Sequence, residues 1–459
     1  MNRKLIIFAV LPLLMACNNG ETSKTDDAFT FVTLDPGHFH AALVQKSMYP
    51  DVDSNVYVYA PDGPDLQLHL NRIEAYNIRE EEPTHWKEHV YTGTDFFQKM
   101  VSEKKGNIVI MAGNNQKKTE YIYNTIDAGM NVLADKPMAI NSEGFELLKS
   151  AFEKAGEKNV LLYDIMTERF EINSILQREF SLDKNLFGEL EKGSLDDPAI
   201  TKESVHYFYK TVSGSTLQRP PWFMDVEQEG EGIVDVTTHL VDLAQWACFP
   251  NQVLDYTKDV EMVSAKRWPT TMTLTQFGAI TKHNSFPDYL RKDLANDTTL
   301  NVYSNGEINY KLRGVHVKVS VIWGYKAPEG TGDTHYSIMR GTRANLVIRQ
   351  GAAEGFKPIL YIEPVKADDT NFEEDLNTSI ATIQANYPGV EVKKSETGWQ
   401  VIVPEKYHVG HEAHFAQVTE NYLKYLKEGK LPDWEVPNMI TKYYITTSAL
   451  DLAKISKAD

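Results

Sequence analysis

The amino-acid sequence predicts an α/β protein. A doubly wound parallel sheet comes first, followed by an α+β domain with a large open, mostly antiparallel sheet. From residue 29 onward, short apolar runs alternate with helical stretches, which is the pattern of successive βαβ units. After residue 170 this rhythm gives way to longer runs, several of which alternate polar and apolar residues, as in an antiparallel sheet with one wet face. The 459 residues are 42% hydrophobic and 24% charged, which is an ordinary globular composition.

The first domain is expected over residues 28–168. We predict its strands at 30–34, 56–59, 108–112, 132–134 and 160–163. Helices are expected between them at 117–128 and 142–155, and Gly129 directly after the first of these is a common signal for a helix C-terminus.

The second domain is expected over residues 169–459. We predict its strands at 272–280, 299–302, 314–323, 336–339, 345–348 and 359–362. An insertion at about 365–405 contains a helix and a hairpin, and two helices near 411–427 and 437–455 close the chain.

The N-terminus is typical of an exported protein. Arg3 and Lys4 precede an apolar run at 5–15, which is the layout of a signal peptide and is too short to span a membrane. The run ends in Leu-Met-Ala before Cys17 and resembles a bacterial lipobox, so residues 1–17 predict a lipoprotein signal and residues 18–27 a linker. A cleaved signal with an accidental cysteine, or a short anchor, is the alternative.

Charge and hydropathy restrict the partners. The net charge is −17 and no stripe of Lys and Arg stands out, which disfavours nucleic acid. No second apolar stretch of about 18 residues follows the first, so we expect membrane contact only through the N-terminal lipid anchor. The expected location is the bacterial cell envelope, on its periplasmic or its surface-facing side.

The turn after the first strand departs from the usual phosphate-binding pattern. In G-x-G-x-x-G turns, glycines let the backbone approach a diphosphate. Here only Gly37 remains, with Asp35 at the first glycine position and His40 at the third. His38 and His40 could offset the charge of Asp35 or donate hydrogen bonds. Asp62 follows the second strand, where an acidic residue usually meets the adenosine ribose, although it could equally be a plain turn residue.

Three polar residues share one face of a predicted helix. Asp235, His239 and Asp242 are spaced i, i+4 and i+7. Removing the proton of an alcohol needs a base, and histidine titrates near neutrality. Lys136, at the carboxyl end of a strand, could hydrogen-bond the same hydroxyl. A hydrogen-bonded pair in a core helix and a metal site built from these three helix residues are the alternatives.

Two segments carry a family resemblance. Residues 134–138 read A-D-K-P-M, and residues 230–242 read G-E-G-I-V-D-V-T-T-H-L-V-D. They resemble the two signatures of the Gfo/Idh/MocA family of sugar oxidoreductases, with Asp135 in place of the glutamate of an E-K-P motif. The turn containing Gly113 and Asn114 is also similar, and the resemblance covers about residues 28–457.

The resemblance implies a Rossmann domain that binds NAD or NADP, and dimers or tetramers built through the open sheet. The cofactor-binding positions it implies are Gly37, His38, His40, Asp62, Gly113, Asn114 and Lys136. The catalytic group it implies is Lys136, Asp235 and His239, with Lys136 and His239 handling the proton and Asp235 orienting the substrate. Which of Lys136 and His239 is the base stays open at this stage.

Further substrate contacts are candidates only. Trp222 could stack on a sugar ring, and Asp242 and His335 could reach the substrate. His411 and His414 are spaced i, i+3 and could share a face that contacts the substrate. Metal binding by the same face is an alternative. We predict no metal site in the chain.

Taken together, these observations predict an NAD(P)-dependent oxidoreductase that acts on a sugar or glycoside hydroxyl. Because no nicotinamide pool recycles the cofactor outside the cytoplasm, the protein would hold its cofactor tightly or complete a redox-neutral cycle. Two other function classes stay open. One is a cell-envelope carbohydrate-binding protein that keeps the fold without the cofactor, and the other is a metal-dependent hydrolase that uses the Asp/His face.

Overall fold

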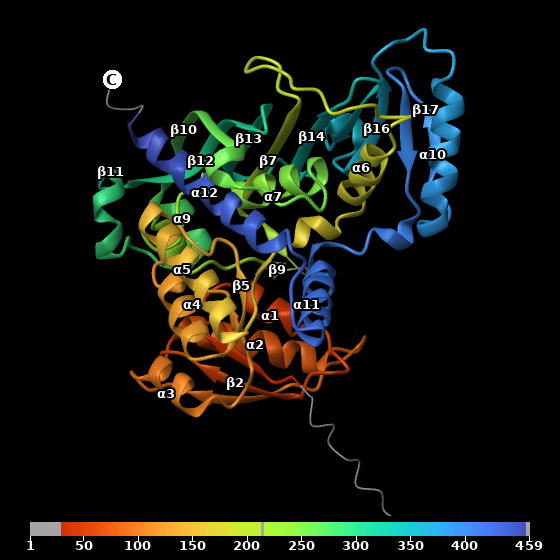
Figure 1. Ribbon diagram of the computed structural model, residues 1–459. Coiled ribbons are helices and arrows are strands. Elements are labelled where there is room, and N and C mark those ends of the chain that lie inside the picture. Colours follow the sequence, from red (N-terminus) through yellow and green to blue (C-terminus); the bar gives the residue numbers. More distant parts are fainter. Residues whose placement is uncertain (1–28, 213–214, 456–459) are drawn as a thin grey trace, which may run out of the picture.

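The computed structural model describes residues 29–212 and 215–455, which form two sheets with helices around them (Figure 1). The first sheet is parallel, with strand order β3-β2-β1-β4-β5-β6. Its strands are β1 (Phe31–Leu34), β2 (Asn55–Tyr59), β3 (Lys87–Tyr91), β4 (Ile108–Met111), β5 (Asn131–Asp135) and β6 (Leu162–Ile165). Its helices are α1 (His40–Val44), α2 (Pro64–Ile78), α3 (Phe96–Glu103), α4 (Lys118–Asp127) and α5 (Ser142–Lys158). The doubly wound fold predicted from the sequence is confirmed, with β3 as an additional edge strand.

The second sheet has ten strands in the described part of the chain. Nine follow the order β10-β12-β13-β7-β14-β15-β16-β18-β17, and β11 pairs with β12. Only the β13–β7 pair is parallel, so the sheet is mixed and mostly antiparallel. Its strands are β7 (Ile200–Tyr209), β10 (Val260–Thr273), β11 (Leu294–Asn296), β12 (Thr299–Leu312), β13 (Val315–Lys326), β14 (Thr334–Arg340), β15 (Ala344–Arg349), β16 (Ile359–Pro364), β17 (Glu391–Lys394) and β18 (Trp399–Ile402). A separate small ribbon pairs β8 (Thr211–Val212) with β9 (Ser215–Thr216).

Helices cover this sheet and connect it to the first domain (Figure 1). The α-helices are α6 (Ile172–Leu182), α7 (Thr237–Cys248), α8 (Tyr256–Asp259), α9 (Leu274–Thr281), α10 (Phe372–Asn386), α11 (His411–Glu428) and α12 (Glu435–Ile455). Short 3-10 turns are η1 (Thr167–Phe170), η2 (Pro221–Met224), η3 (Asp288–Asp293), η4 (Ala352–Glu354) and η5 (Glu405–Tyr407). Within the described residues, none of the helices is both long and apolar enough to span a membrane.

One predicted strand is wrong. Residues 272–280 were expected to be extended, but β10 ends at Thr273 and α9 begins at Leu274. The Thr273 side chain accepts from the backbone of Gln276, and the Gln276 side chain accepts from the backbone of Thr273. This capping box starts a helix inside the apolar run. The predicted helix and hairpin of the insertion do form, as α10, β17 and β18.

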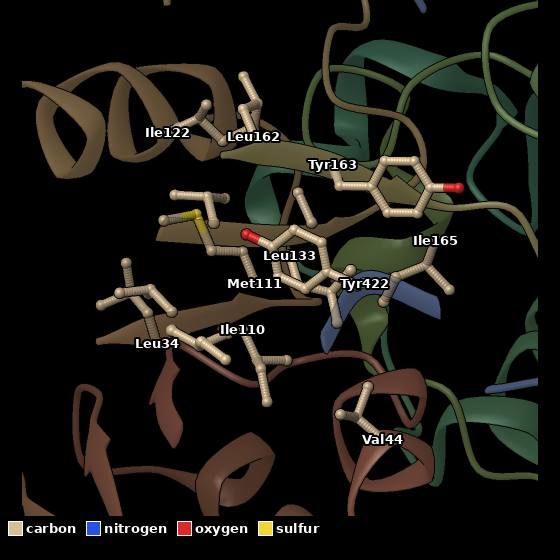
Figure 2. Close-up of a cluster of buried hydrophobic side chains, with 14 of the residues drawn as sticks. Leu34, Val44, Ile110, Met111, Ile122, Leu133, Leu162, Tyr163, Ile165 and Tyr422 are labelled. Carbon is tan, nitrogen blue, oxygen red and sulfur yellow. The ribbon is translucent and has the colours of Figure 1, made fainter. Parts of the chain in front are cut away.

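The closing helices belong to both halves of the molecule. Tyr422 of α11 lies in the core of the parallel sheet beside Tyr163 of β6, with the rings stacked 5.7 Å apart (Figure 2). The same core contains Leu133, Ile110 and Met111, all at most 2% exposed. Because α11 packs against the first sheet and α12 packs against both sheets, the closing helices help to fix the cleft between the two sheets.

Candidate active site

A cavity of about 1550 Å³ lies where the carboxyl edge of the parallel sheet faces the second sheet. In doubly wound proteins this edge is where ligands bind. The turn after β1, the end of β5, η1 and the starts of α7 and α11 contribute to its wall. Strands β7, β13 and β14 of the second sheet also contribute. Segments distant in sequence therefore meet here.

Lys136 and Asp235 form a buried ion pair on the cavity wall. Lys136 follows β5 directly, and its Nζ donates to Oδ1 of Asp235 just before α7. The two side chains are 9% and 7% exposed. Burial by itself would lower the pKa of Lys136, but the carboxylates of Asp235 and Asp135 outweigh burial and leave that pKa above its ordinary value. Lys136 therefore favours its ammonium form, which suits a hydrogen-bond donor better than a base.

Glycines bring Asp235 to this position. Gly232 lies so close to β12 that a Cβ there would be 1.7 Å from the Ser304 carbonyl oxygen. A Cβ added to Gly306 of β12 would in turn be 2.6 Å from Cβ of Ile233. Only glycine permits this approach of two backbones, so the glycine-rich entry seats the segment before α7 against the sheet.

His239 lies in the first turn of α7 and also lines the cavity. Its Nδ1 is buried without a hydrogen-bond partner among the described residues. Burial, reinforced by the nearby Lys136 ammonium, lowers the pKa of His239 to about 3. The imidazole is therefore neutral over the physiological range and can accept a proton. The structure thus gives Lys136 and His239 different charge states, whereas the sequence left open which of them is the base.

A second polar group faces the cavity from α11 and η1. The Glu168 carboxylate lies 3.4 Å from Nδ1 of His411. Burial would raise the pKa of Glu168, but the contact with His411 and the neighbouring histidines holds it well below its ordinary value. His335 also lines the cavity, with burial lowering its pKa to about 4. His414, by contrast, is buried and is not among the residues that line the cavity, although it shares the helix with His411.

Another part of the cavity wall combines aromatic rings with a cation. Arg219 is 4% exposed, and its guanidinium lies 4.2 Å from the ring centre of Phe223 and 5.3 Å from that of Trp323. His206 stacks on Trp323 at 5.1 Å and pairs with Asp333 at 3.1 Å. Sequence analysis missed all five residues. The only signal for Arg219 was its place directly before the Pro-Pro-Trp segment.

Asp242 does not reach the cavity, contrary to expectation. Its carboxylate accepts from Nε and Nη2 of Arg169 at 2.6 and 2.7 Å and from Nζ of Lys442 at 2.8 Å. Lys442 also pairs with Asp164 at 2.7 Å, and Arg169 with Glu435 at 2.8 Å. This network is buried between β6, α7 and α12, so Asp242 has a structural role. The alternative metal site on the Asp235–His239–Asp242 face does not form, because Asp242 pairs with Arg169 and Lys442 instead.

Trp222 is also displaced from its expected role. It is buried outside the cavity wall, and its Nε1 donates to Oδ2 of Asp65 at 2.7 Å. Its ring packs on the first turn, where a Cβ added to Gly37 would be 2.9 Å from Cζ2. The neighbouring Phe223, not Trp222, faces the cavity.

The remaining predicted cofactor positions lie outside the cavity. Asp62 is exposed in the turn after β2. Gly113 supports the first turn, because a Cβ there would be 2.1 Å from the Asp35 carbonyl oxygen. The Asn114 side chain donates to Gln228 at 2.7 Å, so the segment before α7 occupies it. Burial, followed by the nearby carboxylate of Asp65, raises the pKa of Asp35 to about 6.

These observations test the fit of a nicotinamide dinucleotide. The cavity exceeds the roughly 300–1,000 Å³ typical of a site for one small molecule, so a dinucleotide and a sugar can be held together. Lys136, Lys210 and Arg219 supply positive charge on its wall. The Trp222 ring packs against Gly37 of the first turn. The volume and positive charge of the cavity therefore fit a dinucleotide, whereas the first turn has neither its usual glycines nor open space beside Gly37.

The two histidines of the first turn meet Asp135 at the base of the cavity. Nδ1 of His40 lies 2.9 Å, and Nδ1 of His38 3.7 Å, from Oδ2 of Asp135. Burial and the neighbouring histidine lower the pKa of His38 well below its usual value. Burial lowers that of His40 to about 4, although Asp135 opposes it. Both imidazoles are neutral at pH 7.

Two family models match the chain. Residues 176–454 match a model described as "Putative oxidoreductase C terminal domain". Residues 67–163 match "Oxidoreductase family, NAD-binding Rossmann fold", so the first domain is an NAD-binding Rossmann domain. Among curated proteins, none matches the sequence.

Solved structures are also similar. A crystal structure titled "putative oxidoreductase" from Parabacteroides merdae is 58% identical, with a TM-score of 0.92, over 94% of this chain and 98% of that one. Levoglucosan dehydrogenase, solved with NADH and levoglucosan, is 11% identical with a TM-score of 0.58, over 93% and 97% of the two chains. A 3-ketoreductase from Actinomadura kijaniata, solved with NADP, is 13% identical with a TM-score of 0.54, over 93% and 98%. The last two share the fold with this chain.

Proposed function

Because the chain belongs to the Gfo/Idh/MocA oxidoreductase family, we propose that it oxidises a hydroxyl group of a sugar or glycoside with NAD or NADP. The observation that carries the proposal is the cavity wall on which Lys136, Asp235 and His239 lie together. The fold relatives that act on levoglucosan or as a 3-ketoreductase support a carbohydrate substrate.

Each of the three residues has one role in this proposal. An oxidised nicotinamide ring supplies the hydride acceptor when the cofactor is bound. His239 accepts the hydroxyl proton at Nε2, since its Nδ1 is buried and its imidazole is neutral. Lys136 donates a hydrogen bond to the substrate oxygen as negative charge develops there. Asp235 fixes the Lys136 ammonium and keeps it charged.

The aromatic part of the cavity wall suits a carbohydrate. Phe223 and Trp323 offer apolar ring faces, and His206, Asp333 and Arg219 offer hydrogen-bonding groups close to them. A sugar ring has apolar faces and a polar rim, so it needs this combination of aromatic and polar side chains. A redox-neutral cycle on a glycoside belongs to the same proposal, because a tightly held cofactor would be regenerated within it.

Purified protein beginning at Asn18 tests the proposal. After denaturation, mass spectrometry should find a nicotinamide dinucleotide near one per chain, or calorimetry should show that added NAD or NADP binds. A panel of sugars and glycosides should then reduce the cofactor, followed by its absorbance. His239→Asn should abolish reduction, and His85→Ala, at an exposed histidine, should preserve it.

The filled first turn gives a second candidate function, a carbohydrate-binding protein without cofactor. Trp222 on Gly37 and the occupied Asn114 amide favour it. Absence of released dinucleotide, with no binding of added NAD or NADP, would overturn the oxidoreductase proposal. Binding of sugars in the same calorimetric panel would then support the second candidate.

We also propose that a lipid on Cys17 tethers the protein to the bacterial cell envelope, where it could assemble as a homo-oligomer. Cys17 lies outside the described residues, and the apolar run before it is the support. Metabolic labelling with a radioactive fatty acid should label the wild type and not Cys17→Ser. Equal labelling of both would refute the tether.

A further inference from the structure

The first turn carries a set of side chains that neither the sugar chemistry nor the dinucleotide explains. His40 stands at the third glycine position of a Rossmann turn, and His38 lies two residues before it. Asp135 ends β5 in place of the glutamate of the family's E-K-P motif. These positions are about 95 residues apart in sequence, and the sheet order brings them together because β4 alone separates β1 from β5.

We propose that His38, His40 and Asp135 bind a first-row divalent transition metal such as Zn²⁺ at the base of the cavity. The three ligand atoms lie within 4.8 Å of one another. Two of the separations are 2.9 and 3.7 Å. Ligands about 2.1 Å from a tetrahedral ion lie about 3.4 Å apart, so a small movement of the side chains completes the geometry.

The donor set fits this class of metal. Two imidazole nitrogens and one carboxylate oxygen are the protein ligands of many catalytic zinc sites and of non-haem iron sites. The side chains of His38, His40 and Asp135 are 13%, 10% and 5% exposed, so bulk water does not compete freely for the ion. Hard cations such as Mg²⁺ prefer sites made of oxygen atoms and are disfavoured here.

The metal would keep open positions toward the cavity. The side chains of His38 and His40 line the cavity, while Asp135 lies behind them. Three protein ligands leave at least one position of a tetrahedral ion for another group. That group would be an oxygen atom of the bound molecule, from either a phosphate or a sugar. The site thus explains why a turn without its phosphate-binding glycines still faces a ligand cavity.

A competing explanation is a plain hydrogen bond from His40 to Asp135. It accounts for two of the three residues, while Nδ1 of His38, 3.7 Å from Asp135, accepts from the backbone N–H of His40 at 3.4 Å. A metal ion would bind all three side chains and would replace that long contact. The two explanations predict different metal contents for the purified protein.

The test uses the protein from Asn18 onward, stripped with chelator, reloaded with Zn²⁺ and freed of excess by gel filtration. Elemental analysis should find about one Zn²⁺ per chain in the wild type and less than one-tenth in His38→Ala and His40→Ala. His85→Ala, at an exposed histidine far from the cluster, is the matched control and should retain the ion. Full retention by both cluster variants, or no ion in the wild type, would overturn the proposal.

Cobalt provides a second measurement that needs no variant. Wild-type protein loaded with Co²⁺ should show the visible bands of a four- or five-coordinate ion, and inorganic phosphate or glucose should shift them. Bands of fully hydrated Co²⁺ would overturn the site, and bands that neither probe moves would overturn its open position. Neither readout needs cofactor or turnover, so failure of the metal site and failure of the proposed oxidoreductase are distinguishable.

Discussion

Substituting Lys136 by methionine separates its structural role from its chemical role. Because the side chains of Lys136 and Asp235 are 9% and 7% exposed, the single variant leaves a buried carboxylate without its cation. Removing one partner of a buried pair costs about 3–5 kcal/mol of unfolding free energy. The single variant should therefore lose stability as well as turnover.

The matched double variant is Lys136→Met with Asp235→Asn. It replaces both charges by neutral groups of similar size, which is often close to neutral for stability. We therefore expect urea unfolding, followed by circular dichroism, to show recovery of most of the 3–5 kcal/mol lost in the single variant. Turnover should stay at least about 100-fold below wild type, because no ammonium stabilises the substrate oxygen.

Two results would refute this reasoning. A loss below about 1 kcal/mol in the single variant would mean that the pair behaves like an exposed one. Recovery of turnover in the double variant would mean that Lys136 serves only to neutralise Asp235. Lys454→Met, on the exposed face of α12, is the control and should change neither quantity.

Three further predictions follow from the same contacts. Lys442→Met should cost about 3–5 kcal/mol of unfolding free energy, because it leaves the buried Asp164 carboxylate without its cation and removes one of the two cations that pair with Asp242; a cost as small as that of Lys454→Met would contradict the network. The pKa of His239 is lowered to about 3 from 6.5, so the unfolded chain takes up a proton at this residue before the folded chain does. Its contribution therefore makes the unfolding free energy fall as the pH is lowered from 6.5 to 3. With His239 as the base, kcat/KM of the wild type should stay level from pH 8 to about 5, and an acidic limb near pH 6.5 would exclude the lowered pKa. Trp222→Phe should cost about 1.5–3 kcal/mol through its lost hydrogen bond while sugar affinity measured by calorimetry stays unchanged, and weaker sugar binding would return Trp222 to the substrate site.

Local pattern was enough to predict most of the fold. Apolar runs and helix signals predicted the parallel sheet, the insertion and the closing helices. The strand predicted at 272–280 shows where hydrophobic pattern is insufficient. The apolar run is compatible with a strand or a helix, and the capping box formed by Thr273 and Gln276 starts a helix there. Local side-chain hydrogen bonds of this kind override hydrophobic pattern over short stretches.

The polar face of α7 in the candidate site shows the same difference between what local pattern predicts and what the tertiary structure determines. Helical spacing predicted that Asp235, His239 and Asp242 share one side, and the first two do line the cavity. Two turns carry Asp242 past the cavity into the interior, where Arg169 and Lys442 meet it. Spacing determines which side chains share a face but not how far along the helix that face stays open.

The sequence by itself determined most strands and helices of the first domain, the closing helices, the glycine-rich entry before α7 and the residue types on its face, because these depend on neighbours within a few positions. Only the tertiary structure decided that Trp222 fills the first turn, that Lys136 is the charged partner and His239 the neutral one, and that His38 and His40 meet Asp135. Each of these depends on contacts between residues about 100 or more positions apart. Sheet order and burial set such contacts and the pKa values that follow from them, and no local pattern encodes either.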